Sequence, residues 1–235
     1  AAGAIVITTK KGKEGVVSIG VNSRTGANWV NKLPEQQAKY KQGSNYNNKY
    51  TEETYWSWGN EFTSGEPIYN NLKDFFDTGY SFDNSFNVTG GSATGNFYLS
   101  GSNFKQTGIV PTTDYDRTTF RLNGEQRYGI LTFGANASYS VSNTQKTLTG
   151  SGLWGGSGSG YMESIIAWPR NRNMKDWQLP NGDQNLMFPS ILLENNIDNP
   201  YWIVNKNPQT DKTDRFLGTF YATAKLAKGL DFTNP

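Results

Sequence analysis

The sequence predicts an all-β fold, a transmembrane antiparallel β-barrel with long extracellular loops, of which this chain supplies a part. Two long runs of alternating residues predict strands. In the first of these runs, every charged residue from Arg117 to Arg127 falls on the same face. No stretch approaches the roughly 18 consecutive apolar residues of a membrane helix, so any structure that spans a membrane would have to consist of strands.

The clearest alternation lies between Tyr115 and Asn143, and it predicts two antiparallel strands that meet at a tight turn around residues 127–129. Both strands are longer than the usual strand of about 5–6 residues, and a tilted membrane-spanning strand needs about 9–11. Because successive side chains point to opposite faces, each strand has two distinct faces. The first strand has Thr118, Phe120, Leu122 and Gly124 on one face and Arg117, Thr119, Arg121, Asn123, Glu125 and Arg127 on the other. In the second strand, Leu131, Phe133, Ala135, Ala137, Tyr139 and Val141 alternate with Thr132, Gly134, Asn136, Ser138 and Ser140.

The position of the charges favours a membrane wall. A Lys or Arg in the middle of a lipid-facing surface costs about 2–4 kcal/mol, so a wall that faces lipid is expected to keep charges on its other face. Arg117, Arg121 and Glu125 are therefore predicted to face the interior of a barrel. A soluble β-sandwich with one solvated face shows the same alternation, and it stays as an alternative.

Composition excludes several classes of function. The 235 residues carry a net charge of +2, include no Cys and no His, and are 14% aromatic, with a mean hydropathy of -0.67. Without Cys there is no disulfide scaffold or thiolate metal site, and without His the commonest general base is missing. We expect no enzyme activity, no cofactor and no metal, and the near-neutral charge predicts no nucleic-acid partner. The acidic pairs Glu52/Glu53, Asp74/Asp77 and Asp211/Asp214 lack the ligand spacing of a calcium loop.

Further elements follow along the chain. Alternating or β-branched runs predict strands at 4–9, 16–25, 82–90, 96–106 and 215–226, and a truncated strand near the end of the chain. Pro34 at a first helical position and Gly43 after the end predict a helix at 34–41, and a second helix is expected at 69–77. Residues 1–9 lack the basic region of a signal peptide. Both ends are expected to be cut from a longer protein.

The connections between the strands fall into two groups. The turns at 90–95, 127–129 and 227–229 are short and belong to one side of the predicted sheet. The connections at 26–81, 107–114 and 144–214 belong to the opposite side, and two of them are far longer than loops in compact domains. Short periplasmic turns and long extracellular loops are typical of outer-membrane barrels.

Six short motifs carry a resemblance to a known family. They are residues 3–13 (GAIVITTKKGK), 87–92 (NVTGGS), 108–110 (GIV), 116–123 (DRTTFRLN), 199–202 (NPYW) and 214–225 (DRFLGTFYATAK). In their order and spacing, across nearly the whole chain, they resemble the SusC/RagA family of TonB-linked outer-membrane proteins. The resemblance implies that residues 1–13 are the end of a plug domain and its tether. It also implies that residues 14–235 form the first seven or so strands, with their loops, of a large plugged barrel.

The function that this resemblance implies is a channel subunit of a nutrient importer in the bacterial outer membrane. A SusD-like surface lipoprotein would act as a lid over a glycan oligomer or peptide. TonB, acting through segments outside this chain, would displace the plug. A passive porin or adhesin barrel is one alternative, and a secreted glycan-binding β-sandwich is another.

Four groups of residues are candidates for function. Lys10, Lys11, Gly12 and Lys13 are predicted to tether the plug to the barrel, or to form an ordinary basic turn. Aromatic residues of the two long loops are predicted to contact substrate or lid, or to pack the loops' own cores: Trp56, Trp58, Trp154, Tyr161, Trp168, Trp177, Tyr201 and Trp202. Phe82, Phe104, Tyr115, Tyr128 and Tyr139 are predicted to form an interfacial aromatic girdle. Arg117, Arg121 and Glu125 either hold the plug by ion pairs or line a solvated lumen.

Overall fold

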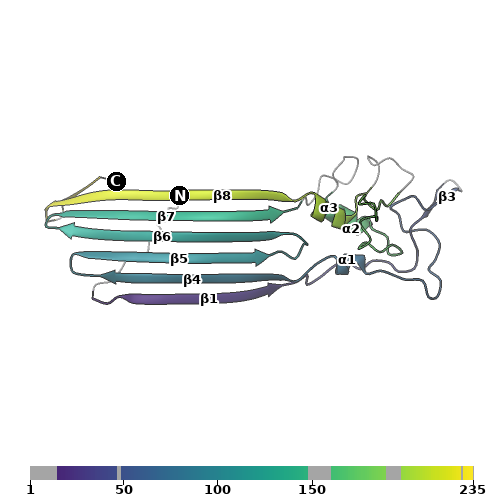
Figure 1. The fold of residues 1–235 in the computed structure, drawn as a ribbon, viewed down its shortest axis with the longest axis horizontal. Coiled ribbons are helices and arrows are strands. Elements are labelled where there is room, and N and C mark those ends of the chain that lie inside the picture. The colour runs from purple at the N-terminus through teal and green to yellow at the C-terminus, as the bar shows by residue number, and fades with distance from the viewer. Residues whose placement is uncertain (1–14, 47–48, 148–159, 189–196, 229, 235) are drawn as a thin grey trace, which may run out of the picture.

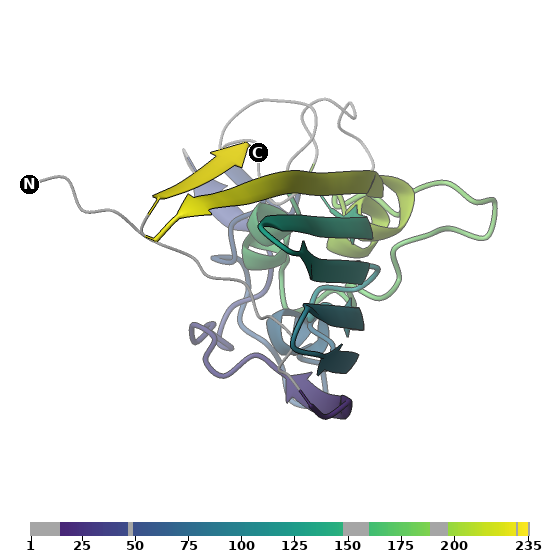
Figure 2. The same cartoon turned by 90° about the vertical axis from the view of Figure 1, so that its left-hand side faces the viewer.

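The computed structural model describes residues 15–46, 49–147, 160–188, 197–228 and 230–234. Its main element is one antiparallel sheet of seven strands in the order β1-β4-β5-β6-β7-β8-β9 (Figure 1). These strands are β1 (Ser18–Asn28), β4 (Gly79–Gly91), β5 (Gly95–Thr107), β6 (Asp114–Tyr128), β7 (Leu131–Lys146), β8 (Gln209–Ala227) and β9 (Leu230–Asn234). Seen from the turn end in Figure 2, the described strands form a single layer that does not close on itself. The strand predicted at 4–9 and the predicted domain boundary at residue 13 lie outside the described residues.

The predicted hairpin is confirmed as β6 and β7. The pairing begins at Tyr128 and Leu131, beside a turn in which Gly129 has a φ of 58°, a left-handed conformation that glycine adopts without strain. Since directly paired residues of neighbouring strands lie on the same face, the register identifies the two faces of the whole sheet.

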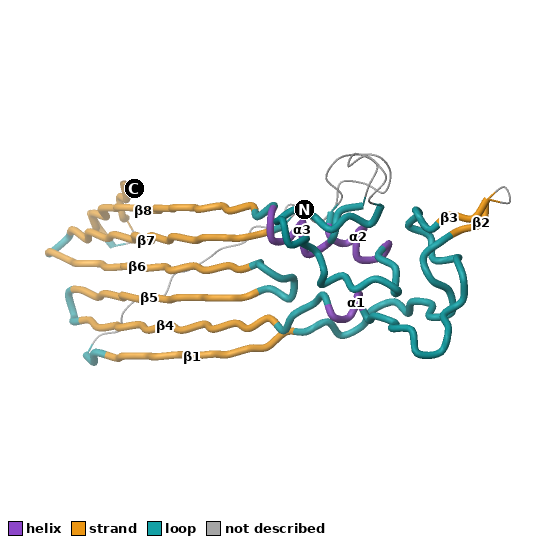
Figure 3. Tube along the Cα trace, turned by 45° about the vertical axis from the view of Figure 1, so that its right-hand side comes forward, coloured by secondary structure: helices purple, strands orange, loops and turns teal. Residues whose placement is uncertain are grey.

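Two long connections form a separate body at one end of the sheet, as Figure 3 shows. This loop body contains the hairpin of β2 (Ser44–Tyr46) and β3 (Lys49–Thr51), and the short helices α1 (Asn71–Asp74), α2 (Tyr161–Ala167) and α3 (Pro200–Lys206). The helix predicted at 34–41 is wrong, because the Gln37 side chain accepts hydrogen bonds from the backbone N–H groups of Lys39 and Tyr40 and holds an irregular turn. The helix predicted at 69–77 is reduced to α1.

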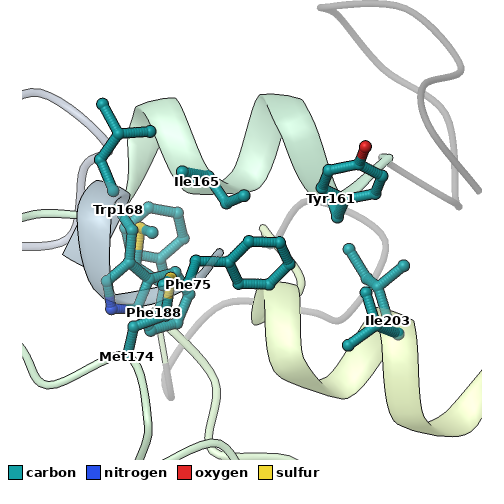
Figure 4. Close-up of a cluster of buried hydrophobic side chains, with 10 residues drawn as sticks. Phe75, Tyr161, Ile165, Trp168, Met174, Phe188 and Ile203 are labelled. Atoms are coloured by element: carbon teal, nitrogen blue, oxygen red, sulfur yellow. The ribbon is translucent and has the colours of Figure 1, made fainter. Parts of the chain in front are cut away.

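The loop body has its own hydrophobic core, drawn in Figure 4. Phe75, which is fully buried, packs its ring against Tyr161 at a centroid distance of 5.6 Å and against Tyr201 at 5.2 Å. Other buried members come from both long connections: Leu72, Ile165, Trp168, Met174, Met187, Phe188, Ile203 and Val204. Burial of these side chains gives the loops the apolar stabilisation that a solvated loop lacks.

Asn71 joins the two connections by hydrogen bonds. Its buried amide donates to the carbonyl oxygens of Pro169 (3.1 Å) and Arg172 (2.9 Å), and its Oδ1 accepts from the backbone N–H of Met174 (3.1 Å). A side-chain amide is well suited to this place, because it supplies both donors and an acceptor. The loop body therefore depends on one side chain that satisfies three backbone groups of the other connection.

We expect Asn71→Ala to loosen the loop body without unfolding the sheet. Loss of its partner leaves each buried backbone group unsatisfied at a cost of about 1–3 kcal/mol, so hydrogen exchange in residues 160–188 should accelerate about tenfold or more. Asn205→Ala is the control, because that exposed amide bonds only the carbonyl of Tyr201 within its own helix. Equal exchange rates in the two variants would contradict the role of Asn71.

Candidate functional site

One face of the sheet is apolar across six strands. A single row of directly paired residues runs through Ile19, Val88, Leu99, Leu122 and Ala137, from β1 to β7, and continues to Gly218 on β8. The large side chains of this face are exposed; Leu131 and Phe133, for example, are 40% and 48% exposed. Among the described residues no second sheet covers them.

The apolar residues form a band whose two edges lie at different depths on different strands. On β4 the aromatic residues of this face continue to Tyr80, eight residues from Val88, whereas on β8 they end at Phe216, two residues from Gly218. On the strands between them the upper edge is irregular, because the last large apolar side chain is Leu99 on β5, Phe120 on β6 and Val141 on β7. The lower edge moves toward the turns, from Phe97, two residues from Leu99 on β5, to Ala224, six residues from Gly218 on β8.

The shift of the lower edge can be compared with the slope that a membrane imposes on tilted strands. In a barrel whose strands tilt by about 35–45°, with strands about 4.8 Å apart and about 3.4 Å per residue, a level plane crosses successive strands about 1.0–1.4 residues apart. The shift of the lower edge, four residues over three steps, agrees with this value. The fold and this surface define the membrane-spanning wall of an antiparallel β-barrel.

The opposite face of the sheet is polar. Arg117, Arg121 and Glu125 lie on it together, opposite Ser142, Ser138 and Gly134 of β7. Glu125 Oε2 accepts a hydrogen bond of 2.8 Å from Tyr221 of β8, and the Tyr221 ring reaches it by passing over Gly134 of β7. A Cβ on Gly134 would lie 2.0 Å from the ring of Tyr221, so only glycine permits this contact. Sequence analysis did not identify Tyr221 or Gly134, since their link depends on the register of three strands.

The predicted aromatic girdle is divided between the two faces. Phe82, Tyr128 and Tyr139 lie on the apolar face, as predicted. Phe104 and Tyr115 lie on the polar face instead, because Phe104 is paired with Arg117 and Tyr115 is two residues from Arg117 along the same strand. Their ring centroids are 6.0 Å apart. Their place in the girdle was predicted from nearness to strand ends, which does not distinguish the faces.

The loop aromatics are also divided. Tyr161 and Trp168 are 8% and 3% exposed in the core of the loop body, so neither offers a ring to a ligand. Trp56 and Trp58, 44% and 66% exposed, lie on the surface of the first connection. Half-buried Trp177 and Trp202 meet edge to face at 6.0 Å, with Lys206 Nζ 5.8 Å and 5.2 Å from their rings. Tyr201 donates a hydrogen bond to the carbonyl of Asp74. Trp154 and the predicted tether, Lys10–Lys13, lie outside the described residues.

Two ion pairs lie in the described part of the loop body, Lys39 with Glu61 and Lys41 with Glu66. Lys41 Nζ lies 2.8 Å from Glu66 Oε1, and this hydrogen bond, together with one from the backbone N–H of Thr63, lowers the pKa of Glu66. Burial lowers the pKa of Arg172, which the charge of Glu52 partly opposes. Burial also raises the pKa of Tyr201, so its hydroxyl stays protonated as a donor. Within the described ranges, no group of three or more acidic residues is placed to hold a metal ion.

The comparisons with known proteins agree with this class. The chain is 25% identical over 241 aligned positions to the TonB-dependent receptor P3 of Formosa agariphila, an alignment that covers 98% of the chain and 22% of that receptor. Its fold matches a chain of the RagAB peptide importer in the closed-closed state (TM-score 0.63, 21% identity) and in the open-open state (TM-score 0.60, 21% identity). Each structural match covers 96% of the chain and 28% of the matched chain. No protein-family model matches the chain.

These findings confirm the predicted resemblance to TonB-linked outer-membrane proteins of the SusC/RagA family. They also confirm the predicted fold class, a partial antiparallel barrel with long loops at one end. The chain spans 22% of the length of the receptor and 28% of the length of the matched importer chain. Among the described residues, no helix has both the length and the apolar character needed to cross a membrane.

We expect Leu99→Arg to destabilise the full-length protein in lipid vesicles far more than Ser102→Arg. Leu99 lies on the apolar face between Val88 and Leu122, whereas Ser102, three residues along the same strand, lies on the polar face opposite Thr119. The first change should lower the free energy of unfolding by about 2–4 kcal/mol, measured by denaturant titration. Equal effects of the two arginines would show that the assigned faces are wrong.

Gly134→Ala should break the contact between Tyr221 and Glu125. The added methyl group collides with the ring of Tyr221, and overpacking of this kind costs about 1–3 kcal/mol. Gly124→Ala is a matched control in the neighbouring strand, because the nearest atom to its added Cβ is 3.7 Å away. The free energy of unfolding of both variants is measured by denaturant titration. A destabilised Gly124→Ala with an unaffected Gly134→Ala would contradict the predicted contact between Tyr221 and Glu125.

Proposed function

We propose that the chain forms part of the channel subunit of a TonB-dependent importer in the bacterial outer membrane. The exposed apolar face is the observation that carries the proposal, because six neighbouring strands keep large apolar side chains on one side of the sheet, as a lipid-facing wall does. The similarity to a TonB-dependent receptor over 98% of the chain supports the same class. The protein moves its cargo without covalent chemistry.

The cargo is an oligomer, either a glycan or a peptide, and a SusD-like surface lipoprotein closes over it. The loop body supports this part of the proposal, because it presents a folded surface at one end of the wall rather than a set of separate loops (Figure 3). Exposed Trp56 and Trp58 offer large apolar rings to the lid or to the cargo, and tryptophans are common at the centres of interfaces. Arg117, Arg121 and Glu125 line the lumen, and Lys10–Lys13 tether the plug.

Uptake of a labelled oligomer by cells should require both the full-length protein and TonB. Deletion of either should reduce uptake to background, because the passage opens only when the plug is displaced. Trp56→Ala combined with Trp58→Ala should lower uptake about tenfold if these rings anchor the lid or cargo. Trp29→Ala is the matched control, since Trp29 is 68% exposed but follows β1 at the end of the wall. Uptake that persists without TonB would favour a passive porin instead.

A further inference from the structure

Three arginines on the polar face have no counter-charge within the described part of the chain. Arg117, Arg121 and Arg215 are exposed, and none has a hydrogen-bond or ion-pair partner among the described residues. Arg127, near the turn, is likewise without a counter-charge among the described residues. Two other cations of this face have an acidic neighbour: Arg24 lies directly opposite Asp83, and Lys146 pairs with Asp211 at 2.5 Å. Unpaired guanidinium groups kept together on one wall are ready to bind an anion.

The register brings these arginines around one point. Thr119 of β6 is paired with Ser140 of β7, and Ser140 is paired with Arg215 of β8. Arg117 and Arg121 lie two residues to either side of Thr119 on β6. The spacing of strands and residues therefore places the three Cα atoms about 12–14 Å from one another. Flexible side chains of this length can converge on a single ligand from that distance.

The surroundings of the three arginines suit a sugar. Serine hydroxyls of β7 lie between them, at Ser138, Ser140 and Ser142, opposite or beside each arginine. Phe104 is paired with Arg117, and its ring lies 6.0 Å from that of Tyr115. Aromatic faces stack on pyranose rings while hydroxyls and charged groups bind their polar substituents.

Arg117 and Arg215 lie toward the loop end of the wall, and Arg121 lies at the middle of β6. Arg117 follows the first residue of β6, Asp114, by three positions, whereas Glu125 and Arg127 lie near the turn at the other end. A molecule that enters from the loop body meets these arginines before it meets Glu125. This order favours a mobile cargo over a group fixed at the turn end.

We infer that Arg117, Arg121 and Arg215 bind the carboxylate or sulfate groups of an acidic oligosaccharide as it passes the mouth of the channel. The inference rests on the proposed import function and specifies the chemical class of its cargo. The Phe104 and Tyr115 rings stack on the sugar, and the serine hydroxyls of β7 bind its hydroxyl groups.

The test is calorimetric titration of the detergent-purified full-length protein with four probes. They are tetragalacturonate, a sulfated galactan tetramer, the neutral galactotetraose and tetraglutamate. At least one acidic sugar should bind about tenfold or more tightly than the neutral tetramer, with an affinity that falls as salt rises. Arg117→Gln, Arg121→Gln and Arg215→Gln should each weaken it about tenfold. Arg127→Gln, on the same strand and face but near the turn, should have no effect.

Phe104→Ala separates a sugar site from a simple anion site. It should weaken binding of the acidic sugars but leave any weak binding of tetraglutamate unchanged. The inference is overturned if neither acidic sugar exceeds the neutral tetramer, if the arginine variants bind as the unaltered protein does, or if tetraglutamate binds as tightly as the sugars. If the inference fails but cells still take up another oligomer in a TonB-dependent way, the proposed import function still holds. If no TonB-dependent uptake of any oligomer is found, the proposed import function is wrong too.

Discussion

The ladder of hydrogen bonds between long antiparallel strands constrains everything else in this chain. In hydrocarbon every backbone N–H and C=O must find a partner within the protein, and paired strands supply those partners. Once the ladder is set, the side chains have no freedom to choose a face, because a slip by one residue moves each of them to the opposite side. The pairing of Leu99 with Leu122 therefore also decides that Arg121 and Ser100 share the other face.

The loop body solves a different problem. Its backbone lies outside the sheet and cannot rely on a ladder, so it needs a core and side-chain partners of its own. Phe75 and Asn71 provide these from the first connection, and the second connection surrounds them with buried residues such as Ile165 and Met174. The third connection joins the same body, because Thr112 Oγ1 donates to the carbonyl of Val204. A surface built in this way holds exposed aromatics in fixed positions, which lowers the entropic cost of binding.

The sequence predicted the strands well, because a period of two residues records directly which side chains share a face. Even β8, the longest strand, was expected over most of its length. The helix at 34–41 failed since Pro34 and Gly43 are equally compatible with an irregular turn, and the competing hydrogen bonds of Gln37 are not visible in a linear pattern. For a related reason, the sequence could not show that Tyr161 and Trp168 are buried while Trp56 and Trp58 are exposed. Burial of a loop residue depends on a partner connection far away in the sequence.

The polar residues of the apolar face show how the register is kept unique. On β4, Asn84 lies between Phe86 and Phe82, where a lone amide in lipid would be costly. Ser23, directly opposite on β1, donates a hydrogen bond of 2.6 Å to Asn84 Oδ1, and Asn103 of β5 donates one of 3.0 Å to Thr118 of β6. A slip of two residues would keep every apolar side chain on the lipid side, so burial alone does not forbid it. It would separate both polar pairs, and the cost of leaving them unpaired in hydrocarbon distinguishes the native register from that slip.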